Sequence, residues 1–165
     1  MTLLTPDLAA LLRRDLHAFI REVETCPDDA ALWRPAPGFP NSVGNLALHV
    51  AGNLRHFVGG VLGRSGYVRN RELEFSQRQG SRAEVRAQLE AALAELEPGL
   101  ARLDAAALAA PYPLAVAGVQ LPTGRFLLHL ATHLAFHLGQ AGALRRVLTG
   151  GPALAGAMGL DALAP

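Results

Sequence analysis

The sequence contains no lysine, and all fifteen of its basic residues are arginine. Against fourteen acidic residues they leave a net charge of +1, and they are scattered apart from the pairs Arg13–Arg14 and Arg145–Arg146. Aromatic residues are also scarce, at 5% of the chain. A nucleic-acid surface needs clustered positive charge and commonly aromatic side chains. We therefore expect no nucleic-acid partner.

Cysteine and long apolar runs are nearly absent as well. Cys26 is the single cysteine, so no internal disulfide can form, which agrees with a reducing compartment. Half of the residues are hydrophobic, yet no apolar run approaches the length of about 20 residues that spans a bilayer. The N-terminal stretch carries Asp7 early and has helical periodicity, unlike a signal peptide. We expect a cytoplasmic protein, with no membrane partner, in which residues 1–165 form one domain.

Acidic residues are missing from residues 123–150, although this stretch holds three of the six histidines. His129, His133 and His137 recur every four residues, which stacks their rings along one face of a helix. By angle, His133 and His137 fall inside an apolar stripe and His129 lies at its edge, the stripe being Phe126, Leu130, Ala141, Leu144 and Leu148. Imidazoles in a core need partners for both ring nitrogens, and a metal ion would satisfy this need.

The spacing of His133 and His137 also occurs in zinc metalloproteases, where a glutamate lies between the two histidines. Here the intervening residues are Leu134, Ala135 and Phe136, so the protease interpretation is poor. Any further metal ligand, and any carboxylate base, must come from elsewhere in the chain.

Four long helical patterns predict an all-α protein with a four-helix bundle. They begin at Thr5, at Asn41 or Ser42, at Ser81 and at Thr123, where hydroxyl or amide side chains can cap a helix. A long first connection, residues 30–40, is expected to be irregular and anchored by Trp33. Residues 63–80 read as a charged loop, and a long third connection includes an extended or hairpin crossover at residues 111–120.

The second helical pattern supplies a third candidate ligand, His49. Asn45 and Asn53 lie four residues before and after it, and His56 lies two turns further on. Alone, His49 reads as a histidine at the edge of the core. Antiparallel helices of a bundle can, however, bring His49, His133 and His137 to one ion, and three neutral nitrogens leave a position open, as in catalytic sites. His56 is the weaker candidate.

The charged loop carries Arg69 and Arg71, for which two interpretations stay open. Their guanidinium groups could hold an anionic group of a substrate through paired hydrogen bonds. Alternatively, both are solvated charges that pair with Glu72 and Glu74.

Three stretches together resemble the DinB-like superfamily of metal-binding bundles, and the resemblance covers nearly the whole chain. They are NSVGNLALHVAGNLRHF, GYVRNRELEF and HLATHLAFHLGQAGALRR. The family pattern is one histidine on the second helix and an H-x-x-x-H pair on the fourth, often followed by R-G-Q. These positions are His49, His133 and His137 here, with Leu138 in place of the arginine and the glycine and glutamine kept.

The resemblance implies a divalent metal on these three histidines, commonly zinc or nickel, and often a homodimer. Characterised relatives include thiol S-transferases that use bacillithiol or mycothiol and a maleylpyruvate isomerase. We therefore expect an enzyme whose metal activates a low-molecular-weight thiol or a water for attack on a small-molecule substrate. A thiol S-transferase is the first hypothesis. The alternatives are a metal-dependent hydrolase and a non-catalytic bundle that binds metal or is merely structural. In this scheme Asn45, Asn53, His56 or His129 could orient ligands or shuttle protons, and Arg69 or Arg71 could hold a carboxylate.

Overall fold

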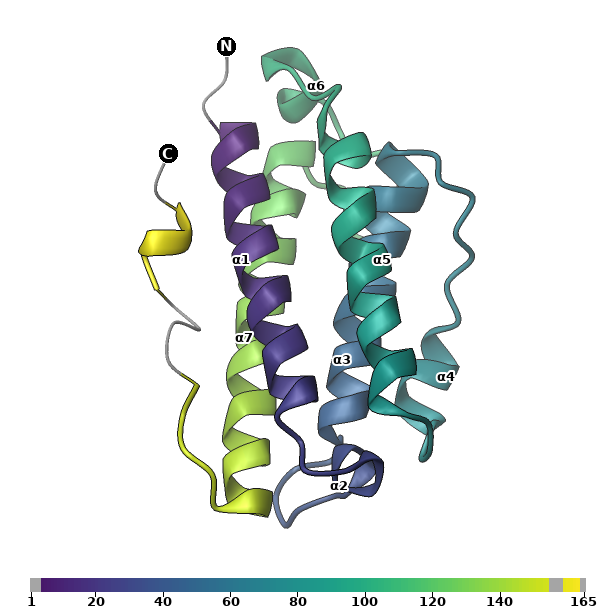
Figure 1. Ribbon diagram of the computed structural model, residues 1–165. Helices are drawn as coiled ribbons and strands as arrows, with labels where there is room; N and C mark the ends of the chain where they lie inside the picture. Colours follow the sequence, from purple (N-terminus) through teal and green to yellow (C-terminus); the bar gives the residue numbers. More distant parts are fainter. Residues whose placement is uncertain (1–3, 155–158, 164–165) are drawn as a thin grey trace.

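The computed structural model describes residues 4–154 and 159–163. In these ranges the regular structure is helical, without strands (Figure 1). The four long elements are α1 (Leu4–Glu24), α3 (Val43–Leu54) continued by the π-helical segment η1 (Arg55–Leu62), α5 (Arg82–Leu100) and α7 (Thr123–Thr149). The short ones are α2 (Asp29–Trp33), α4 (Arg71–Ser76), α6 (Ala105–Ala109) and the 3₁₀ turn η2 (Asp161–Leu163). The predicted all-α bundle is confirmed.

The order of the helices in space explains the long connections. α1 packs against α5 and α7, and α3 with η1 packs against the same two helices from the other side. α1 and α7 run in one direction while α3 and α5 run in the other (Figure 1). Because α3 and α5 are parallel neighbours, the chain must return along the bundle between them. The segment that does so carries α4.

Two of the predicted helix starts are capping boxes. The Ser42 hydroxyl accepts a hydrogen bond from the Asn45 backbone N–H, and the Asn45 side chain accepts one from the Ser42 N–H. Ser81 and Glu84 make the same reciprocal pair at the start of α5. These local bonds satisfy backbone donors that a helix start leaves without partners.

The two threonines expected to cap helices bond elsewhere. Thr5 lies inside α1 and its hydroxyl donates to the carbonyl of Leu103, while Thr123 opens α7 and donates to the carbonyl of Ala110. Both therefore tie a helix end to the third connection. At the other end, α7 stops at Gly150, whose φ of 66° is the left-handed conformation that favours glycine.

The first two connections contain more helix than the sequence predicts. α2 overlaps the stretch expected to be irregular, and at its start the Asp28 carboxylate accepts a hydrogen bond from the Ala31 N–H. α4 lies in the stretch expected to be a loop and is capped by Asn70. Both helices are too short to display an apolar period, so only their caps mark them. Trp33 is the expected anchor: it is buried, and its indole donates to the Gly80 carbonyl at 2.7 Å.

The third connection takes the hairpin form of the predicted crossover. Val116 and Val119 exchange two backbone hydrogen bonds across Ala117 and Gly118, whose φ angles of 50° and 77° are those of a tight hairpin turn. Tyr112, at the start of this hairpin, is buried.

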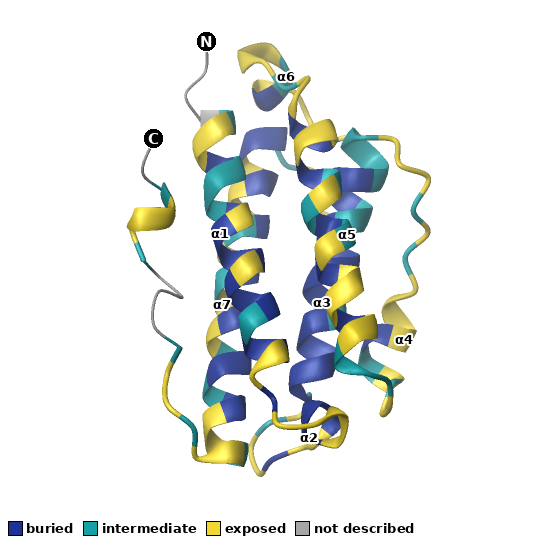
Figure 2. Ribbon diagram, viewed as in Figure 1, coloured by how far each residue is buried: buried dark blue, intermediate teal, exposed yellow. Residues whose placement is uncertain are grey.

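The buried residues lie on the sides of the four long helices that face one another (Figure 2). On α7 the sequence predicts His133 and His137 inside the apolar stripe, and this placement is only partly right. Leu134 and Leu138 occupy the buried face, while both histidines are half-buried at its margin and His129 is exposed. The leucine row extends the buried face away from the histidines, whose rings lie at its margin beside His49 of α3. Among the described residues, no helix has the length and apolarity needed to cross a membrane.

Candidate metal centre

Three histidines from two antiparallel helices meet at one point. His49 comes from α3, and His133 and His137 come from successive turns of α7. The Nε2 atom of His133 lies 3.3 Å from that of His49 and 3.1 Å from that of His137. One ligand nitrogen from each ring lies within 4.8 Å of the others, so this group could hold a metal ion.

The hydrogen bonds behind two of the rings determine which nitrogen faces the centre with a lone pair. His49 Nδ1 lies 2.9 Å from Glu74 Oε2, and His137 Nδ1 lies 2.8 Å from Gln140 Oε1. Both oxygens accept hydrogen bonds, so each Nδ1 carries the proton and each Nε2 is a bare acceptor. His133 Nε2 can donate its proton to only one of these two acceptors. A cation between the three nitrogens would satisfy all of them.

The surroundings also keep the two rings from α7 neutral. Burial lowers the pKa of His133 to about 4, and the neighbouring His137, His49, His129 and Arg69 act in the same direction. Burial lowers the pKa of His137 as well, although its hydrogen bond to Gln140 opposes the shift. Neutral imidazole is the form that binds metals, so His133 and His137 are in their ligating form near neutral pH.

Two of the three separations between the ligand nitrogens match those around a small divalent ion, and the third is within 4.8 Å. Nitrogens bound at about 2.0–2.1 Å around a tetrahedral zinc are separated by about 3.3–3.4 Å, and octahedral geometry brings them somewhat closer. The observed separations of 3.3 and 3.1 Å fall in this range. With three protein ligands, either geometry leaves at least one position for a substrate or water.

A buried carboxylate that the sequence did not single out, Glu74 of α4, stands behind His49. It is 5% exposed, and Arg69 holds it with two hydrogen bonds, Nε to Oε1 and Nη2 to Oε2, each 2.7 Å long. Burial by itself would raise the pKa of Glu74, but the hydrogen bonds and charges of Arg69 and His49 outweigh it and hold the pKa below its usual value. Glu74 is therefore ionised, and it contacts the histidine group through His49 Nδ1.

Two residues of α3 make room for Glu74 and support it. The Asn45 side chain donates to the backbone carbonyls of Glu74, at 2.9 Å, and of Gln77, at 3.0 Å, and so fastens α4 to α3. A Cβ at Gly52 would lie 2.2 Å from Glu74 Oε1, closer than any real contact. Position 52 must therefore be glycine for the Glu74 carboxylate to keep this position.

Arg69 and Arg71 have different environments. Arg69 is paired with Glu74, as in the second of its two interpretations, but the pair is buried rather than solvated. Arg71 is exposed, with its guanidinium 5.1 Å from the ring centre of Phe75. The Phe75 ring in turn packs 4.7 Å from the His49 ring.

The remaining candidates surround the histidine group without joining it. Asn53 is buried on α3 one turn beyond His49. His56 is half-buried on η1, and burial followed by the nearby charge of Arg69 lowers its pKa. His129 is exposed, with its ring 5.8 Å from the ring of His133.

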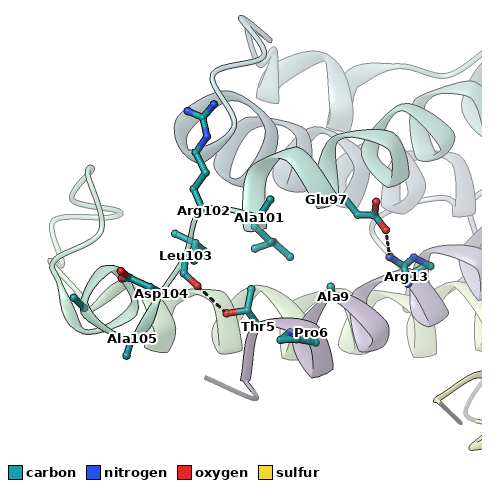
Figure 3. A pocket seen from close by; sticks show the side chains of 12 residues that line it. Thr5, Pro6, Ala9, Arg13, Glu97, Ala101, Arg102, Leu103, Asp104 and Ala105 are labelled. Atoms are coloured by element: carbon teal, nitrogen blue, oxygen red, sulfur yellow. Dashed lines mark hydrogen bonds and ion pairs between the residues drawn. The ribbon is translucent and has the colours of Figure 1, made fainter. Parts of the chain in front are cut away.

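A large pocket lies elsewhere in the described part of the molecule. It has a volume of about 980 Å³ and is bounded by the start of α1, the end of α5 and the start of α6 (Figure 3). The ion pair between Arg13 and Glu97 lies at one end of it, and the bond from Thr5 to Leu103 lies at the other. No residue of the histidine group lines this pocket.

Cys26 is also remote from the histidines. It is buried, its thiol donates to the Glu22 carbonyl, and burial raises its pKa to about 11. The chain therefore has no reactive thiol of its own near the site.

Comparison with known families agrees with the geometry. The family model described as the DinB superfamily matches residues 11–141, a span that contains all three histidines and Glu74. A search of curated proteins found no match.

Proposed function

This chain belongs to the DinB superfamily, and from that membership we propose a metal-dependent enzyme whose divalent ion is held by His49, His133 and His137. The observation that carries the proposal is the convergence of three ring nitrogens. His133 Nε2 can donate a hydrogen bond to only one of the other two, so at least one inward lone pair has no donor among them. Zinc and nickel are the ions we assign, since neutral imidazoles suit both. A divalent ion bound there supplies Lewis acidity, which lowers the pKa of a thiol or water towards neutrality.

The reaction we propose is transfer of a low-molecular-weight thiol to a small electrophile. The buried Cys26 cannot act as the nucleophile, so the thiol must come from solution. Its sulfur forms the new bond to an electrophilic carbon, whose leaving group departs with the bonding electrons. To His129, which is exposed one turn from His133, we assign the role of accepting the thiol proton.

We further propose that the functional unit is a homodimer, as the family resemblance implies. Leu128, Phe136 and Val147 are 45%, 61% and 64% exposed. At about 100° per residue they lie within an arc of about 100° on the outward side of α7, beside the histidine row. A second copy of the chain would cover this apolar face.

The first test is the elemental metal content of tag-free protein purified without chelator. We expect close to one zinc or nickel ion per chain, and loss of that ion in the double variant His133→Ala/His137→Ala. A folded parent that contains no metal and takes up neither added zinc nor added nickel would overturn the proposal.

A second test separates the candidate reactions. The metal-loaded protein is assayed with low-molecular-weight thiols and alkylating electrophiles, and in parallel with esters, amides and lactones without thiol. Turnover that needs a thiol supports the transferase. Turnover only without thiol assigns a hydrolase, in which water uses the same open position, and no turnover on either panel leaves a non-catalytic metal-binding bundle.

A further inference from the structure

We propose that Glu74 is the positioning residue of the histidine centre: its carboxylate keeps the proton of His49 on Nδ1, so that Nε2 is free to bind a metal. The inference rests on the proposed metal site and assigns a role to a residue outside its three ligands. Glu74 reaches His49 from α4, 25 residues further along the chain.

Two groups compete for His49 Nδ1. Glu74 Oε2 lies 2.9 Å away and can only accept a hydrogen bond, so it requires a proton on Nδ1. Arg69 Nη2 lies 3.2 Å away and can only donate, so it requires a lone pair there. Were Arg69 the sole partner, the proton would move to Nε2, and that nitrogen could no longer bind an ion.

The structure decides this competition in favour of the carboxylate. Arg69 Nε and Nη2 each already bond a Glu74 oxygen at 2.7 Å, and Nη2 lies farther from His49 Nδ1 than Glu74 Oε2 does, at 3.2 Å against 2.9 Å. Asn45 holds the Glu74 backbone carbonyl, and the missing side chain of Gly52 leaves space for Oε1. Glu74 is thus fixed on both sides, with one oxygen directed at Nδ1.

A carboxylate hydrogen-bonded to the non-ligating ring nitrogen is common behind metal-binding histidines. A carboxylate behind the ring fixes the tautomer and makes the ligating nitrogen more basic, and its loss typically weakens metal binding by about 10–100-fold. Glu72 offers a matched control, because it is an exposed carboxylate on the same short helix.

The decisive experiment is carried out on metal-free protein. Long-range ¹H–¹⁵N NMR of the imidazole rings identifies the tautomer of His49 in the parent, in Glu74→Ala and in Glu72→Ala. We expect the Nδ1–H form in the parent and in Glu72→Ala, and a shift towards the Nε2–H form in Glu74→Ala. An Nε2–H form in the parent, or an unchanged His49 in Glu74→Ala, overturns the proposal.

Removal of Glu74 leaves the Arg69 charge buried without its partner, so a double variant, Arg69→Met/Glu74→Ala, protects the test against misfolding. With neither partner at Nδ1, we expect a mixture of both tautomers of His49. A pure Nδ1–H form in this variant would also overturn the proposal.

Zinc affinity, measured by competition with a chelator, gives a second readout. We expect affinity about 10–100-fold weaker in Glu74→Ala and unchanged in Glu72→Ala. Equal affinity in parent and Glu74→Ala overturns the positioning role. If the parent shows the expected tautomer but binds no metal, the proposed function fails while the role of Glu74 in setting the tautomer stands.

Discussion

At the scale of single residues, the ring nitrogens that face away from the cluster decide what the cluster can do. His49 and His137 each point a bare Nε2 inward because Glu74 and Gln140 accept from Nδ1. Leu138, which stands where the family pattern has arginine, is 5% exposed and belongs to the core. Arg69 brings a positive charge next to His49, and Glu74 compensates it.

Acid should destabilise the metal-free protein through His133. Its pKa is about 4 in the folded chain against 6.5 for an ordinary histidine. Between these values the unfolded state binds more protons, so the free energy of unfolding is highest above pH 6.5 and falls as the pH drops towards 4. Urea unfolding at pH 7.5 and pH 5 measures this loss. In His133→Gln the loss should be smaller, and an equal loss in both proteins would contradict the assignment.

Gly52→Ala should destabilise the protein by about 1–3 kcal/mol, the usual cost of forcing an extra group into a packed site. The new Cβ would lie 2.2 Å from Glu74 Oε1 and would push the carboxylate from its place behind His49. Urea unfolding gives the change. The control is Gly139→Ala on α7, where a Cβ meets no atom within 4 Å. There the higher helix propensity of alanine should stabilise the protein by up to about 1 kcal/mol. A similar result for both variants would rule out the packing argument.

At the scale of elements, the second long helix changes its winding where it leaves the histidine site. α3 ends at Leu54 and η1 continues it as a π-helix that carries His56 and Phe57. π-helical segments open the backbone hydrogen-bond ladder and are frequent at functional sites. The Tyr112 hydroxyl, from the third connection, donates to the Phe57 carbonyl at 2.7 Å. The hairpin thus supports the helix at this change of winding.

Tyr112→Phe should therefore lower the free energy of unfolding by about 1–2 kcal/mol, because it leaves a buried carbonyl without its donor. Tyr67→Phe is the matched control. Tyr67 is half-buried under the Arg55 guanidinium, a contact that phenylalanine keeps, and its hydroxyl bonds to no other described residue. We expect a change within about 0.5 kcal/mol there. Chemical denaturation of both variants provides the test, which fails if their losses are the same.

At the scale of the whole molecule, one side of the bundle differs from the others. α7 packs against α1 and α3, and its outward side carries exposed Leu128, Phe136 and Val147. The C-terminal turn η2 contacts α1 (Figure 1). The apolar side of α7 is thus uncovered by other described parts of the chain and borders the histidine group.

Phe136→Glu should convert the proposed homodimer to a monomer, because it places a charge at the centre of the apolar side of α7. Sedimentation equilibrium at several concentrations measures the molecular mass of parent and variant. Leu160→Glu serves as control, since Leu160 is 76% exposed on the chain segment that flanks α1. A monomeric parent, or a dimer that survives Phe136→Glu, would remove this surface from consideration.

The helices themselves could be predicted from the sequence because their causes are local. The α1 stripe of Leu8, Leu12, Leu16, Phe19 and Val23 is buried as its period requires. Ser42 and Ser81 cap α3 and α5 through bonds that span three residues. α2 and α4 were missed because a helix of five or six residues has no period to detect.

The sequence by itself determined a helical bundle and three histidines that antiparallel helices can bring together. Only the tertiary structure decided that His133 Nε2 lies 3.1 Å from His137 Nε2 and 3.3 Å from His49 Nε2. It also placed Glu74 behind His49. The tertiary structure likewise pairs Arg69 with the Glu74 carboxylate. Helix formation follows from neighbours a few residues apart, whereas the site depends on the packing of α3, α4 and α7, whose contacts join residues 25 to 84 positions apart.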